Sequence, residues 1–202
     1  MGRINHERQE ERRRHIRDAA LACFKRSGFH QTSIAEICAE ARMSPGNLYR
    51  YYDSKEAIIE AICEDDRQRV TDRIQAIKGR ENLMVAMLEI AGETMSASTD
   101  TAKSRFACEI LAEAMRNERV GAIVRRHNAA LLDICTEAIA QAQAAKQVDP
   151  GLDPMLAATL LMGAAEGLGT RLALHSHLDA KQSIAMFQLL IARFLRPRDN
   201  AL

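Results

Sequence analysis

Side chains that can bind anions gather in one short segment, between residues 44 and 55. The segment holds all three tyrosines of the chain together with Asn47, Arg50 and Lys55. Hydroxyl, amide and guanidinium groups of this kind bind phosphate oxygens and base edges, and arginine is the side chain that most often reads guanine. The segment therefore predicts a surface that binds nucleic acid.

Three helices, with a tight break between the second and the third, are expected to position this segment. The first should run from about Glu7 to Arg26. Ser33 and Glu36 have the spacing of a capping box, so the second helix should begin here. Ser44 can cap a third helix over about Pro45–Tyr51, with proline in the first turn, where its missing N–H is tolerated. This succession describes a helix-turn-helix unit.

Few side chains of the third helix are suited to packing. Leu48 and Tyr52 are four positions apart and can face a core. Asn47, Tyr49 and Arg50 then lie on or near the outer surface, together with Tyr51. The first helix should turn a solvated face outward, which carries Arg12, Arg13, Arg14 and Arg17.

Residues 28–56 follow a pattern of fixed spacing: Gly28-Phe29-x-x-Thr32-Ser33-Ile34-x-x-Ile37-x-x-x-Ala41-x-x-Ser44-x-Gly46-x-Leu48-Tyr49-x-Tyr51-Tyr52-x-Ser54-Lys55-Glu56. This pattern resembles the DNA-binding domain of TetR-family transcriptional regulators, and the resemblance covers about residues 10–60. Met43 and Tyr52 depart from the residues that are common in the family, and neither change is expected to abolish DNA binding.

The resemblance implies a role for ten side chains of this domain. Thr32 and Ser33 would lie near phosphates at the second helix, and Tyr49, Tyr51 and Lys55 would contact the DNA backbone. The side chains that would face the major groove are Ser44, Pro45, Gly46, Asn47 and Arg50.

Composition predicts an all-α protein of about nine helices. The 202 residues include only four prolines and ten glycines, no tryptophan and 4% aromatic residues, which favours helices over a β-sandwich. Residues 1–55 carry a net charge of +4 and residues 56–202 a net charge of −3, the charge layout of a basic head on a slightly acidic body. With the resemblance, this predicts a DNA-binding domain at 1–55 and a ligand-binding and dimerisation domain at 56–202.

Other features argue for a cytoplasmic protein without a cofactor. No apolar run reaches the roughly 18–20 residues that span a bilayer, and the N-terminus lacks the apolar stretch of a signal peptide. Five scattered cysteines without a C-x-x-C pair fit a reducing compartment. His175 and His177 would point apart on a helix, so we expect no metal site.

The last two helices carry enough apolar surface to need a partner. Family members dimerise through these two helices, so the resemblance implies a homodimer here. The side chains expected at the dimer interface are Leu161, Ala164, Leu168, Phe187 and Ile191. An internal core made by the same residues is the alternative.

A ligand pocket is expected in the helical body. Methionine lines adaptable sites, and a polar side chain on an apolar stripe can anchor a ligand. The expected pocket residues are Met87, Phe106, Glu109, His127, Met162 and Glu166. For His127, a core histidine bonded to a backbone carbonyl is the alternative, and for Glu166 a surface glutamate.

These features together predict a ligand-responsive transcriptional regulator that binds double-stranded DNA as a homodimer. Repression of a palindromic operator, relieved by a small molecule, is the favoured mode. One alternative is a thiol redox sensor on the same scaffold, with Cys38 as the sensor. The other is a helical enzyme that uses Glu166 and His127 as acid and base, although no catalytic motif supports it.

Overall fold

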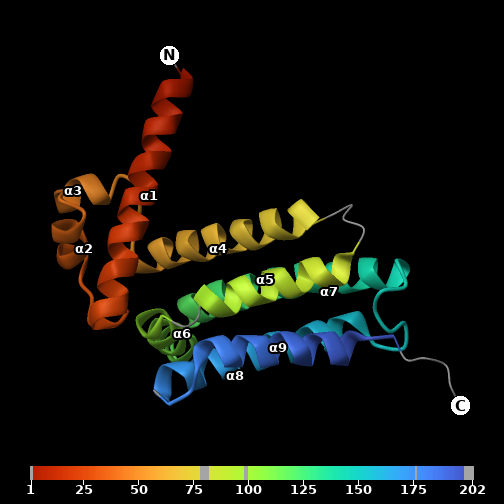
Figure 1. The fold of residues 1–202 in the computed structure, drawn as a ribbon. Coiled ribbons are helices and arrows are strands. Elements are labelled where there is room, and N and C mark those ends of the chain that lie inside the picture. The colour runs from red at the N-terminus through yellow and green to blue at the C-terminus, as the bar shows by residue number, and fades with distance from the viewer. Residues whose placement is uncertain (1, 78–81, 98–99, 176, 198–202) are drawn as a thin grey trace, which may run out of the picture. The chain divides into compact units, whose positions relative to one another are not determined.

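Helices are the only regular secondary structure in the described part of the chain (Figure 1). The computed structural model describes residues 2–77, 82–97, 100–175 and 177–197. Within these ranges lie the nine predicted helices, and no strand is present. Their bounds are α1 Gly2–Ser27, α2 Ile34–Glu40, α3 Pro45–Leu48, α4 Lys55–Ile77, α5 Leu83–Ala97, α6 Thr101–Ala114, α7 Glu118–Ala144, α8 Pro154–Leu174 and α9 Ala180–Leu195. The predicted all-α class is confirmed.

The helices group into two compact units. The first comprises residues 1–66 and 105–127, and the second comprises residues 67–104 and 128–202. Helices α4 and α7 each begin in the first unit and end in the second. These units are defined by the packing of the chain, whereas the predicted boundary at residue 55 separates DNA binding from ligand binding and dimerisation. The predicted boundary therefore stays a prediction.

The core of the first unit is built from α1, α2, α3 and the start of α4, together with residues of α6 and the first part of α7. Ile16, Phe24, Ile37 and Leu48 are fully buried. The Phe24 ring stacks on that of Phe106, with 5.7 Å between the ring centroids. Leu48 and Tyr52 both face this core, as the sequence predicts.

The start of each short helix is fixed by a local cap. Ser33 Oγ accepts a hydrogen bond from the Glu36 backbone N–H at 3.1 Å, and the Ser33 N–H donates to Glu36 Oε2 at 2.6 Å. Ser44 Oγ accepts from the Asn47 N–H at 3.4 Å. Both predicted caps are confirmed. They can be predicted from the sequence because each depends only on residues three positions apart.

The third helix is shorter than predicted. It ends at Leu48, and the chain tightens into a turn in which the Tyr51 N–H donates to the Leu48 carbonyl at 2.8 Å. The Tyr51 carbonyl is then free to accept a hydrogen bond from Arg13 Nη1 of α1, at 3.1 Å. This contact comes from a distant helix, so local propensity could not reveal it.

The predicted solvated face of α1 is partly wrong. Arg12 and Arg14 are exposed, but Arg13 is half-buried and Arg17 is only 8% exposed. Arg17 is buried because it forms an ion pair with Asp65 of α4 and hydrogen-bonds the Tyr52 hydroxyl at 3.2 Å.

The second unit is a bundle of α5, the second half of α7, α8 and α9. Met95, Ile139, Phe187, Ile191 and Leu195 form its buried core. Helices α5 and α9 pack side by side (Figure 1). The N-cap residues of α8 and α9 are Asp153 and Asp179. Among the described residues, no helix combines the length and the apolarity that a membrane span requires.

We predict that Gly28→Ala destabilises the protein. Gly28 has a φ of +81°, a left-handed backbone that a side chain strains, and an added Cβ would collide with the Glu109 carboxylate. The free energy of unfolding, measured with urea, should fall by roughly 1–2 kcal/mol. Gly46→Ala is the matched control, because a Cβ there meets open space. Equal stability of the two variants would contradict the prediction.

Candidate nucleic-acid interface

Helix α3 presents an outer surface that takes no part in the core. Ser44, Pro45, Gly46, Tyr49 and Arg50 are exposed, and Tyr49 is 51% exposed. A Cβ on Gly46 would have no neighbour within 4 Å, so another molecule can approach the backbone closely here. The structure therefore brings five of the predicted DNA-contacting residues onto one accessible surface.

Three further predicted residues are less accessible or already engaged within the protein. Asn47 and Tyr51 are half-buried, and Ser33 is exposed but engaged in its capping box. The hydrogen bond from the Ser33 backbone N–H holds the pKa of the Glu36 carboxyl below its usual range. Glu36 therefore keeps a negative charge beside Ser33, which disfavours a phosphate at this position.

Thr32 and Lys55 are occupied by contacts within the protein. Thr32 is buried, and its hydroxyl donates to the Gly28 carbonyl at 2.7 Å. Lys55 Nζ donates to the carbonyls of Phe29, at 2.8 Å, and of Thr32, at 2.7 Å. It also contacts the His30 carbonyl and lies over the Phe29 ring. These two residues hold the turn between α1 and α2, and their predicted phosphate contacts stay predictions that the geometry does not favour.

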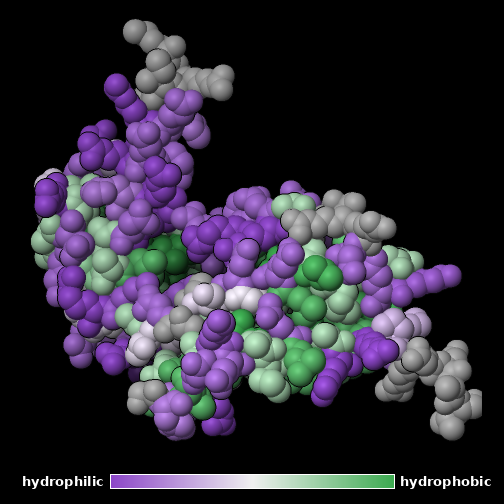
Figure 2. All heavy atoms as spheres, viewed as in Figure 1, coloured by the Kyte–Doolittle hydropathy of each residue, from purple (hydrophilic) through white to green (hydrophobic). Residues whose placement is uncertain are grey.

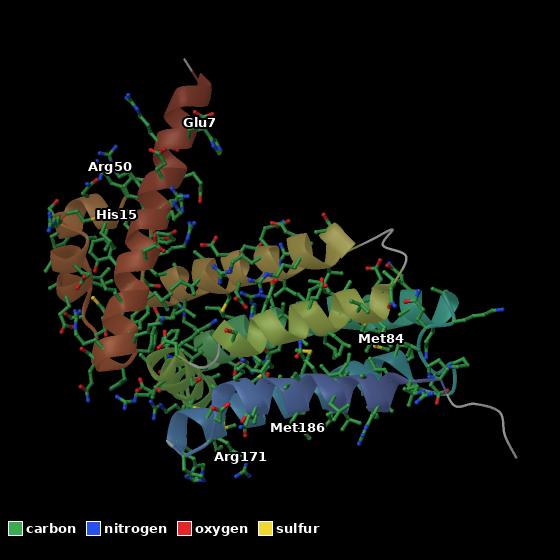
Figure 3. The ribbon with its side chains drawn as sticks, in the orientation of Figure 1. Glu7, His15, Arg50, Met84, Arg171 and Met186 are labelled. Atoms are coloured by element: carbon green, nitrogen blue, oxygen red, sulfur yellow. The ribbon has the colours of Figure 1, made fainter. Side chains whose placement is uncertain are left out.

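One side of α1 lies beside this surface. It includes Arg12, which the sequence places on a face exposed to solvent. Arg8, Arg12 and His15 of α1 line a groove together with Arg50 and Tyr51. Figure 3 shows His15 and Arg50 next to each other, one from α1 and one from the turn after α3. The spacing of Arg8, Arg12 and His15 along α1 is visible in the sequence, but the groove that these residues line is not.

A partly open cavity of about 270 Å³ lies in the second unit. Its walls are nearly all apolar, and Thr94, Cys135 and Glu166 supply the polar side chains. Three of the predicted ligand residues, Met87, Met162 and Glu166, line it. Sequence reasoning missed the other wall residues, among them Val70, Ile74, Ile90, Leu131 and Ala165.

The other three predicted ligand residues do not line this cavity. Phe106 stacks on Phe24, Glu109 lies beside Gly28, and His127 Nε2 lies 3.5 Å from Asp66 Oδ2. All three belong to the first unit. His127 is thus neither in the cavity nor bonded to a backbone carbonyl among the described residues.

The predicted dimer residues divide between interior and surface. Phe187 and Ile191 are buried within the core of one chain, whereas Leu161, Ala164 and Leu168 are half-buried. The exposed apolar side chains of the last helices are different ones: Leu156 and Leu160 on α8, and Met186, Leu189 and Leu190 on α9. Apolar atoms are visible on the surface over α9 in Figure 2.

The cysteine environment does not support the redox alternative. Cys38 and Cys23 are buried, and burial raises the pKa of both thiols. Burial also raises the pKa of Cys63 to about 11. A sensor thiol needs access to solvent and a lowered pKa; Cys23 and Cys38 have neither property, and the pKa of Cys63 is raised.

Comparison with known families matches both parts of the chain. Residues 16–62 match the family described as "Bacterial regulatory proteins, tetR family". Residues 85–196 match "BetI-type transcriptional repressor, C-terminal". The first match contains the whole helix-turn-helix segment, and the second covers more than half of the chain.

Individual relatives agree with these matches. The HTH-type transcriptional regulator UidR of Escherichia coli (strain K12) is 30% identical over 169 residues, which are 83% of this chain and 84% of that protein. The Salmonella enterica GusR structure is similar with a TM-score of 0.77 and 28% identity, over 92% of this chain and 95% of that one. FadR of Bacillus subtilis, solved with stearoyl-CoA, has a TM-score of 0.76 at 18% identity over 90% of this chain and 98% of that one, which shows a shared fold. The chain belongs to the TetR family of bacterial transcriptional regulators.

Proposed function

We propose that the protein is a homodimeric repressor that binds a palindromic operator and is released from it by a small, largely apolar ligand. The observation that carries the DNA-binding role is the outer surface of α3, where five exposed residues take no part in the core. A segment that is kept accessible and polar over a fully packed Leu48 is suited to contact a partner. The expected site of action, with DNA as partner, is the cytoplasm.

The outer surface of α3 fits the major groove of B-DNA. A helix in this groove reads base edges with its first residues, and backbone contacts fix its register. Ser44, Pro45, Gly46 and Asn47 occupy the first turn of α3 and its cap, whereas Tyr49 and Tyr51 follow it. Asn47 is the side chain best suited to a base, because its amide can pair with adenine in two places.

We predict that Asn47→Ala weakens binding to the operator selectively. The loss should be roughly 1–3 kcal/mol on a duplex that the protein selects from a random library, because a base contact is removed. Binding to a random-sequence duplex should change little. Fluorescence anisotropy with both duplexes at one salt concentration measures this, and an equal loss on the two would show that Asn47 does not read bases.

The surface of α8 and α9 supports the proposed dimer. Leu156, Leu160, Ala164 and Gly167 follow one another at helical spacing on α8 and share one side of it. On α9, Met186 is 61% exposed and Leu190 is 48% exposed. An apolar surface of this kind on a chain that binds a twofold operator is suited to an isologous contact with a second copy.

We predict that Leu190→Glu disrupts the dimer. Burying a carboxylate in an apolar interface should cost roughly 3 kcal/mol, which weakens association more than 100-fold. Light scattering at micromolar concentration should give twice the chain mass for the wild type and a lower mass for the variant. Leu111→Glu is the matched control, because Leu111 of α6 is 40% exposed and belongs to the first unit. Monomeric wild-type protein, or an unchanged L190E dimer, would contradict the proposed interface.

The cavity of the second unit supports the proposed ligand response. Its volume of about 270 Å³ suits a small aromatic ligand, and its apolar walls would take the ligand out of water. A ligand that binds one dimer conformation better than another shifts the population toward it and can thus release DNA. Helix α4 begins in the DNA-binding unit and ends beside the cavity with Ile74, so it links the two parts of the chain.

We predict that Ala165→Leu reduces the binding of an apolar probe. Ala165 lines the cavity, so a larger side chain there fills part of it. The affinity for the neutral dye N-phenyl-1-naphthylamine, followed by its fluorescence, should fall about tenfold, or roughly 1.4 kcal/mol. Ala140→Leu is the control, because Ala140 is exposed on α7 and lies outside the cavity. Equal dye affinity in the two variants would show that the cavity is not the site.

A further inference from the structure

The groove between α1 and the turn after α3 has the chemistry of a phosphate site. Its volume is about 570 Å³, and its lining is mostly polar. Arg8 and Arg12 come from α1, and Arg50 comes from the turn after α3. Glu11 is the one carboxylate in the lining, so three guanidinium groups and one carboxylate leave a net charge of two positive units.

Helix geometry keeps the α1 side of this groove together. Arg8, Arg12 and His15 are separated by four and then three residues, so their side chains share one face of the helix. The His15 Nε2 nitrogen lies 2.9 Å from the Ala41 carbonyl, and this hydrogen bond fixes the ring against the loop after α2. Arg50 reaches the same groove from the opposite side (Figure 3).

The arginines around the groove divide into two groups, according to whether a group of the protein binds their side chain. Arg13 donates to the Tyr51 carbonyl, and Arg17 forms an ion pair with Asp65, so both of these cations are committed to the fold. Arg8, Arg12 and Arg50 have no ion pair and no side-chain hydrogen bond among the described residues, and all three are exposed. Cations that are gathered from two elements and left without an acidic partner are available for an external anion.

We propose that this groove binds phosphates of the DNA backbone next to the bases that α3 reads. Arg50 is then a backbone contact, in place of the major-groove role that the family resemblance implies, and α1 extends the contact with Arg8 and Arg12. The proposal rests on the proposed DNA binding.

Two observations favour DNA over a free anion. The groove shares Arg50 and Tyr51 with the segment that follows α3, so it continues the proposed DNA surface. Its cations also come from two separate elements, α1 and the turn after α3, and are open to solvent, which suits a line of phosphates better than one enclosed anion.

The test is the salt dependence of DNA binding by the double variant Arg8→Gln/Arg12→Gln. Each phosphate contact contributes about 0.9 to the slope of log affinity against log salt. A dimer that loses both side chains in each head should therefore show a slope smaller in magnitude by about two to four units, equally on the selected operator and on a random-sequence duplex. Arg14→Gln is the matched control, because Arg14 is exposed on α1 but does not line the groove.

A substitution of opposite charge gives a second, independent readout. Glu11→Gln removes the carboxylate from the groove, so it should raise the affinity for both duplexes at low salt and steepen the salt dependence. A variant that had only damaged the fold would lower the affinity instead. Thermal melting of each variant checks that the helices are intact.

Several outcomes would overturn the proposal. An unchanged slope in the double variant, or the same change in Arg14→Gln, would remove the groove from the DNA contact. A loss confined to the selected operator would show that these arginines read bases. Tight binding of inorganic phosphate alone, with an unchanged DNA slope, would assign the groove to a free anion. In each case wild-type binding to DNA is retained, whereas a wild-type protein that bound neither duplex would refute the proposed function itself.

Discussion

The position of the proposed reading surface depends on a buried guanidinium, that of Arg17. Its head group lies inside the first unit and is balanced by the carboxylates of Asp65 and Glu10 and by the hydroxyl of Tyr52. A buried cation is stable only when it is paired, so these groups hold one another in place. Because Tyr52 follows the turn after α3 and Asp65 belongs to α4, the Arg17 side chain connects α1, this turn and α4 within the first unit.

Helix α1 therefore serves two purposes with one residue type. The side toward the protein uses Arg13 and Arg17 to hold the turn after α3 and the middle of α4. The neighbouring side keeps Arg8 and Arg12 accessible. The chemistry is the same on both sides, and the difference lies in whether a carboxylate or carbonyl stands within reach. Charge counting along the sequence cannot separate these two uses, because it gives every arginine equal weight.

What the sequence predicts well is local. The caps at Ser33 and Ser44 follow from residues three positions apart, and the structure contains both. The helix order and the inward positions of Leu48 and Tyr52 follow from periodicity and are also observed.

What it predicts poorly depends on distant partners. Lys55 looks like a free cation at a helix start, but the carbonyls that occupy it belong to the turn between α1 and α2. His127 does follow buried residues of an apolar stripe, such as Val120 and Val124, yet its partner Asp66 lies on α4. The walls of the cavity likewise come from five helices. The sequence therefore predicted only those wall residues whose type is unusual there, namely Met87, Met162 and Glu166.

The short third helix also has a consequence for how such a regulator can change. Its attachment to the core relies on Leu48, and the residues around it are accessible. Substitutions at Pro45, Gly46 or Asn47 should therefore alter the preferred operator at little cost to folding. After a gene duplication, two copies could diverge in the promoters they control while they keep one scaffold. The same separation makes these positions the natural ones to randomise when a repressor with a new target sequence is engineered.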